Sequence, residues 1–123
     1  MPLVARHGAL TDIGLHRKTN EDTLVVAPPL FAVCDGMGGA QAGEVASARA
    51  AETLAAAVAD GRPLLAAAEQ ANAAVYRRAN DDREHTGMGT TLTAVVLAGD
   101  TGHFVHIGDS RVRIGETVFR YEE

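Results

Sequence analysis

Short apolar stretches rich in β-branched residues alternate with polar or glycine-containing loops in the first and last thirds of the chain. Such stretches are typical of β-strands, and adjacent ones with short connections are typical of hairpins. The strands that this pattern predicts cover residues 3–10, 23–27, 30–35, 90–97, 103–107, 111–114 and 117–121. We expect the strands flanking Pro28-Pro29 to pair, and the strands flanking residues 98–102 to form a hairpin.

The middle third of the chain has helical periodicity. From Gln41 to Gly61 the sequence is rich in alanine, and its larger apolar residues recur mostly three or four positions apart, which predicts a helix closed by Gly61. Pro63 suits the first turn of a second helix. The residues expected to face the core are Val45, Ala48, Ala51, Leu54, Ala55 and Val58 in the first helix, and Leu64, Ala68, Ala71, Val75 and Ala79 in the second.

The order of strands, two helices and strands again indicates an α+β fold with an antiparallel sheet. A chain of 123 residues is long enough for one modest core, so we expect a single domain over residues 1–123. The composition is 46% apolar and 22% charged, and the formal net charge is −5. Because no cluster of Lys and Arg is present, we expect no nucleic-acid partner.

The single cysteine, Cys34, lies in the apolar stretch 30–34, which favours a small buried side chain over a reactive thiol. With one cysteine, no intramolecular disulfide can form. No apolar run approaches the length of a bilayer span, and residues 1–10 lack a basic start followed by an apolar core. The sequence therefore predicts no membrane association and a cytoplasmic location.

Asp35 ends an apolar strand and is followed by glycines at 36, 38 and 39 before a helix begins. A dinucleotide-binding loop has a similar order, but the third glycine position of that fingerprint is occupied by Gln41, and no acidic residue ends a following strand. An aspartate at the mouth of the loop would also repel a pyrophosphate. Carboxylate and carbonyl oxygens are the ligands that Mg²⁺ and Mn²⁺ prefer, so this loop favours a hard divalent cation.

Glu21 and Asp22 are adjacent, so on an extended strand they would point to opposite faces, and both could serve one site only if the chain bends or water intervenes. Arg17, four residues before Glu21, carries a fixed positive charge on a planar guanidinium that is suited to a bidentate contact with phosphate. A solvated loop and a simple turn explain the same residues equally well at this point.

Two other kinds of site are disfavoured. His103 and His106 are three apart in a predicted strand, on opposite faces and without a cysteine pair, which argues against zinc. The stretch Gly108-Asp109-Ser110-Arg111-Val112 differs from a nucleophile elbow at its last position, where glycine is needed.

Four segments together resemble the bacterial PPM (type 2C) family of metal-dependent protein serine/threonine phosphatases. They are GLHRKTNED at 14–22, FAVCDGMGGAQAGEVAS at 31–47, MGTTLTAVVL at 88–97 and HIGDSR at 106–111, in the order and approximate spacing of the family. The resemblance implies the family's fold, a four-layer αββα sandwich of two antiparallel sheets with outer helices. It also implies a phosphoprotein substrate, with a serine/threonine kinase or its targets as partners.

The resemblance further implies a role for each matching residue. Asp35 would bridge two Mn²⁺ or Mg²⁺ ions, with the Gly36 carbonyl and Glu21 binding one of them, and Asp109 would help to bind a third. Asp22 would orient a metal-bound water, and Arg17 would hold the substrate phosphate. The implied reaction is direct attack on phosphorus by a hydroxide that bridges the metals.

Two aspartate motifs from the second half of the family's domain, one DGxxD-like and one DN, do not occur before Glu123. We therefore expect an apparently truncated domain with half of a two-metal site, low activity and uncovered apolar strand faces that favour self-association. Two functions stay open: a phosphatase of this family, or a non-catalytic relative that binds metal, phosphoprotein or a complementary chain.

Overall fold

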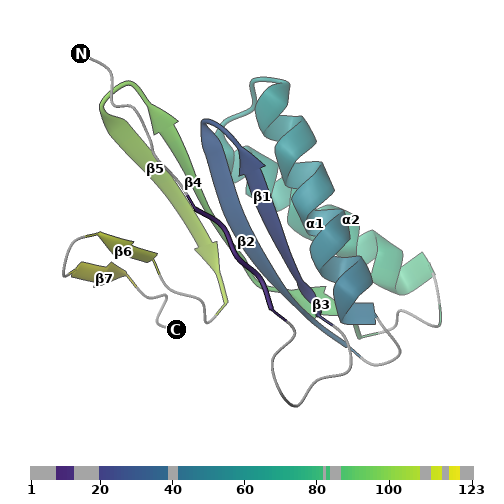
Figure 1. The fold of residues 1–123 in the computed structure, drawn as a ribbon. Helices are drawn as coiled ribbons and strands as arrows, with labels where there is room; N and C mark the ends of the chain where they lie inside the picture. Colours follow the sequence, from purple (N-terminus) through teal and green to yellow (C-terminus); the bar gives the residue numbers. More distant parts are fainter. Residues whose placement is uncertain are drawn as a thin grey trace.

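A computed structural model of the chain describes residues 8–12, 20–38, 42–81, 83, 87–108, 112–114 and 117–119. Two helices pack against an antiparallel sheet (Figure 1), which confirms the α+β class. The elements in chain order are β1 (Asp22–Ala27), β2 (Leu30–Met37), α1 (Ala42–Ala59), α2 (Leu64–Asp81), β3 (Gly89–Thr90), β4 (Leu92–Ala98), β5 (Thr101–Ile107), β6 (Val112–Ile114) and β7 (Thr117–Phe119).

The main sheet has the order β1-β2-β4-β5, and the short strand β3 pairs with the end of β2. The predicted hairpins are present: β1 and β2 join at Pro28-Pro29, and β4 and β5 join through a turn at Gly99-Asp100, shorter than expected because both strands extend into the predicted loop. Strands β6 and β7 form a separate pair. The prediction of a strand over 3–10 is wrong where the structure describes it, since residues 8–10 are exposed and lie outside any strand.

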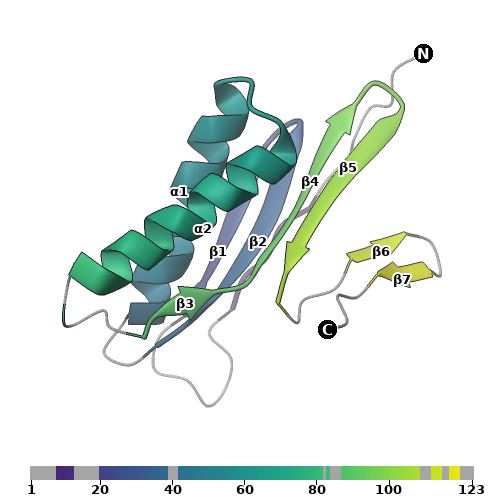
Figure 2. The ribbon, with the colours of Figure 1, turned by 180° about the vertical axis from the view of Figure 1, so that it is seen from behind.

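Both helices lie on one side of the sheet (Figure 2). Helix α1 ends as the sequence predicts: Gly61 has φ 86°, its N–H donates to the Val58 carbonyl, and the Arg62 N–H donates to the Ala57 carbonyl. These two bonds satisfy carbonyls that a helix end would otherwise leave without partners. In the part of the chain that the structure describes, no helix has both the length and the apolarity needed to cross a membrane.

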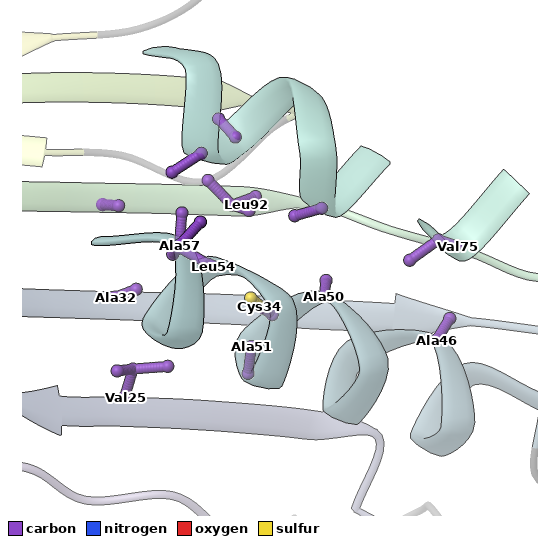
Figure 3. Close-up of a cluster of buried hydrophobic side chains, with 14 of the residues drawn as sticks. Val25, Ala32, Cys34, Ala46, Ala50, Ala51, Leu54, Ala57, Val75 and Leu92 are labelled. Carbon is purple, nitrogen blue, oxygen red and sulfur yellow. The ribbon is translucent and has the colours of Figure 1, made fainter. Parts of the chain in front are cut away.

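The face of α1 against the sheet differs from the expected stripe. Of the predicted residues, Ala51 and Leu54 are buried, whereas Val45, Ala48, Ala55 and Val58 are half-buried at the flanks. The residues in contact with the sheet are mostly smaller, and Figure 3 shows Ala46, Ala50, Ala51, Leu54 and Ala57 in one cluster with Val25, Ala32 and Cys34. Small side chains let the helix axis approach the sheet closely, and this displaces the larger valines from the centre of the contact.

The opposite face of the sheet is also apolar over most of its length. Strand alternation places Leu24 and Val26 of β1, Val33 of β2, and Val95 and Leu97 of β4 on this face. Val26 is 44% exposed and Val33 is 42% exposed. Among the described residues, the helices therefore cover one face of the sheet and leave apolar side chains accessible on the other, as predicted.

Cys34 is fully buried in the core between β2 and α1, and burial raises the pKa of its thiol from 9.0 to about 11. Because the thiolate is the reactive form, we expect a disulfide reagent to modify Cys34 slowly in the folded chain at pH 8 and rapidly after denaturation. Since the thiol pKa is higher in the folded chain than in the unfolded chain, the free energy of unfolding should also fall as the pH rises from about 9 to 11. Equal modification rates in folded and denatured protein would contradict this placement.

Candidate functional site

Four of the six residues predicted to form the site lie at one end of the sheet, where β1 begins and β2 ends. They are Glu21, Asp22, Asp35 and Gly36, and this end of β2 lies beside β3 and the start of α1 (Figure 1). Arg17 and Asp109 lie outside the described residues.

Asp22 and Asp35 are direct cross-strand partners in the antiparallel register of β1 and β2. Residues opposite each other in such a pair project from the same face, and alternation along β2 places Asp35 on the face away from the helices. Two carboxylates in this arrangement repel each other unless a cation or a proton lies between them. The pairing therefore suits a divalent cation.

Glu21 precedes β1 and turns toward the helix. Its backbone carbonyl accepts a 3.1 Å hydrogen bond from the Gly36 N–H, which extends the contact between the two strands beyond Asp22. Its side-chain oxygen Oε2 is buried against Gly43 in the first turn of α1 and has no hydrogen-bond partner among the described residues. A buried carboxylate oxygen without a partner is costly unless a cation neutralises it, and the positive end of the helix dipole gives only partial compensation.

Two glycines make this arrangement possible. A Cβ at Gly36 would overlap the carbonyl of Gly43, and a Cβ at Gly43 would overlap the Glu21 carboxylate. Strand β2, helix α1 and Glu21 therefore meet where no side chain larger than hydrogen fits. Nearby, the Thr23 hydroxyl lies 2.8 Å from that of Ser47, a buried residue of α1, which adds a polar contact between β1 and the helix.

The backbone of Asp35 is fixed by Thr91, which sequence reasoning did not identify. The Thr91 N–H donates to the Asp35 carbonyl at 2.8 Å, and the Thr91 hydroxyl Oγ1 accepts from the Asp35 N–H at 3.1 Å. Thr91 separates β3 from β4, and the pairing with β2 keeps the same register on both sides of it. The only sequence signal for this role is its place in the segment MGTTLTAVVL.

His106 lies on the same face of the sheet as Asp35, two strands away. Its ring nitrogen Nδ1 is 2.8 Å from the Thr93 hydroxyl, and Nε2 is 2.9 Å from the Gly108 carbonyl. Thr93 and His106 are cross-strand partners, whereas His103 pairs with Val96 on the helix-covered face. The two histidines thus lie on opposite faces, as predicted, and no group of three or more His, Cys, Asp or Glu side chains among the described residues is arranged to hold a metal.

Comparisons with known proteins agree on one family. Residues 17–119 match the family model of protein phosphatase 2C. The chain is 44% identical over 115 residues to the serine/threonine protein phosphatase PstP of Mycobacterium tuberculosis, covering 89% of this chain and 22% of that protein. It is 35% identical over 116 residues to the serine/threonine phosphatase stp of Listeria innocua, covering 82% of this chain and 46% of that protein.

A solved structure shares the fold. The catalytic domain of PstP in complex with two manganese ions superposes with a TM-score of 0.76 at 38% identity, covering 95% of this chain and 54% of that one. The chain thus spans about half of the solved domain and corresponds to its N-terminal part.

We expect Gly43→Ala to destabilise the chain by about 1–3 kcal/mol, because the new Cβ must displace the Glu21 carboxylate or move the helix away from β2. Chemical denaturation monitored by circular dichroism measures the change. Gly102→Ala is the matched control, since a Cβ there would lie at an ordinary 3.6 Å from the Phe104 ring. Equal stability of Gly43→Ala and the parent chain would contradict the close contact.

Proposed function

The chain belongs to the protein phosphatase 2C family, and we propose that it supplies part of the active site of a metal-dependent protein serine/threonine phosphatase. The observation that carries this proposal is the pairing of Asp22 with Asp35 at the end of the sheet, within a segment that matches the family from residue 17 to residue 119. The substrate class that follows is phosphoserine and phosphothreonine in proteins.

We propose that Asp35, Glu21 and the Gly36 carbonyl hold Mn²⁺ or Mg²⁺. The donors are hard oxygens, which suits either ion, and the partnerless Oε2 of Glu21 is a donor that a cation would satisfy. Because Glu21 is directed toward α1 in the described structure and Asp35 lies on the other face, a shared ion requires Glu21 to rotate away from Gly43. Divalent ions in such a site lower the pKa of water and neutralise charge on phosphoryl oxygens.

The other predicted residues would act on the water and the substrate phosphate at the metal site. Asp22, opposite Asp35, would orient the attacking water and accept its proton. Arg17 would bind the phosphoryl oxygens through its planar guanidinium, and Asp109 would help to hold a further ion. Water would attack phosphorus, the P–O bond to the serine or threonine oxygen would break, and the proton accepted by Asp22 would pass to that oxygen. The products are the hydroxyl side chain and inorganic phosphate.

A second candidate function is a non-catalytic one, in which the chain pairs with a complementary chain or with a second copy of itself. The accessible apolar face, with Val26 and Val33 more than 40% exposed, favours it. Hydrolysis of a small aryl phosphate with added Mn²⁺ separates the two functions. We expect low turnover, because the chain spans about half of the solved catalytic domain.

For the metal, we expect the chain to bind Mn²⁺ weakly and Asp35→Asn to bind it at least about tenfold more weakly, because one charged oxygen ligand is lost. Isothermal titration calorimetry measures both. Asp60→Asn is the matched control, since Asp60 is an exposed aspartate just after the C-terminal end of α1, whereas the candidate site lies at the N-terminal end of that helix. Equal binding by Asp35→Asn and the parent chain would remove Asp35 from the site.

For phosphate, we expect Arg17→Ala to weaken binding of phosphate or of an aryl phosphate by about 1.5–3 kcal/mol, the range for a charge-assisted hydrogen bond. The affinity for Mn²⁺ should stay nearly constant, because Arg17 carries no metal-binding oxygen on its side chain. Titration of each ligand into both proteins separates the effects. An unchanged phosphate affinity and Michaelis constant would assign Arg17 to the solvated surface.

A further inference from the structure

Thr91 holds Asp35 through both its backbone and its side chain. In a regular antiparallel pair, both residues exchange backbone N–H and carbonyl bonds. Here the Thr91 N–H donates to the Asp35 carbonyl and the Asp35 N–H donates to the Thr91 hydroxyl, while the Thr91 carbonyl accepts a 2.8 Å hydrogen bond from the Thr90 hydroxyl. Thr91 is 6% exposed, so this hydroxyl is held in the protein interior and fixes the position of the Asp35 backbone.

The other side of Thr91 is packed against Gly108. A Cβ at Gly108 would lie 2.5 Å from the Thr91 methyl carbon Cγ2, and Gly108 has φ 109°, a conformation in which glycine is strongly favoured. The Gly108 carbonyl is in turn 2.9 Å from His106 Nε2. Since a carbonyl only accepts, Nε2 carries the proton, and in the neutral ring Nδ1 accepts from the Thr93 hydroxyl.

The geometry points to Thr91 and His106 as positioning residues that hold the backbones of Asp35 and Gly108 in one fixed relation. His106 keeps the Gly108 carbonyl in place, Gly108 confines the Thr91 methyl, and the Thr91 hydroxyl fixes the Asp35 N–H. This inference rests on the proposed function in taking Asp35 as a metal ligand. Metal sites lose affinity when their ligands are held less precisely, which gives these two residues a role in the site without contact to the metal.

Matched substitutions separate the contacts. Thr91→Val keeps the shape and removes the hydroxyl, whereas Thr91→Ser keeps the hydroxyl. At position 106, an amide nitrogen of Gln reaches about as far as Nε2 and can still donate to Gly108, whereas Asn reaches only as far as Nδ1. Thr93→Val removes the hydrogen-bond partner of His106 Nδ1, so it should also loosen the hold of His106 on the Gly108 carbonyl.

The first readout is hydrogen exchange of the Asp35 amide by NMR in the metal-free chain, relative to the amide of Leu54, which is fully buried in α1. We expect Thr91→Val to accelerate it about two- to tenfold, the range for loss of one hydrogen bond. His106→Asn and Thr93→Val should also accelerate it, although Thr93 is paired with Val33 and His106 in the sheet and neither residue is paired with Asp35. Thr91→Ser and His106→Gln should stay within about twofold of the parent chain.

The second readout is Mn²⁺ affinity, which should fall in Thr91→Val and His106→Asn and be retained in Thr91→Ser and His106→Gln. Asp35 exchange unchanged in both His106→Asn and Thr93→Val would overturn the inference, as would equal effects of Asn and Gln at position 106. Because the exchange is measured without metal, a positive exchange result with no Mn²⁺ binding in any protein would support the positioning contacts and contradict the proposed function.

Discussion

The contact between Gly36 of β2 and Gly43 of α1 determines how the first helix packs on the sheet. Neither position has room for a Cβ, so the start of the helix lies directly on the end of the strand, and the Glu21 carboxylate occupies the space that a side chain at Gly43 would fill. This close packing sets the height of α1 above the sheet, and the row of small residues that follows in α1 continues it. It also places Glu21 beside the end of the strand that carries Asp35.

The open face of the sheet is divided into two regions by the same geometry. Toward the β1–β2 and β4–β5 turns its side chains are apolar, whereas toward β3 it presents Asp22, Asp35, Thr93 and His106. The polar end costs stability through the opposed carboxylates, and the apolar end costs it through exposed surface. Binding of cations would reduce the first cost, and a covering layer over the apolar side chains would reduce the second. An uncovered face is consistent with a chain that spans about half of the solved catalytic domain.

Much of the fold could be predicted from the sequence because its signals are local. The two-residue Pro28-Pro29 connection, the Gly61 helix end and the β-branched strands each act within a few residues. The buried face of α1 could not be predicted in the same way, because it depends on how closely the helix approaches the sheet. The expected stripe placed Val45 and Val58 against the core, whereas the close contact is made by Gly43 and Ala46. The pairing of Asp22 with Asp35 follows from the hairpin register, whereas the Thr91 contact joins residues 56 apart and leaves no local signal.

We propose that the end of the sheet that carries Asp22 and Asp35 binds a divalent cation. Paramagnetic broadening of the chain's amide NMR signals by substoichiometric Mn²⁺ tests it most directly, because broadening falls steeply with distance from the ion. If the cation binds at this end, the signals of residues 21–22 and 35–36 disappear first, while those of α2 stay sharp. Broadening centred on another acidic group, such as Glu69 or Asp81 of α2, would contradict it.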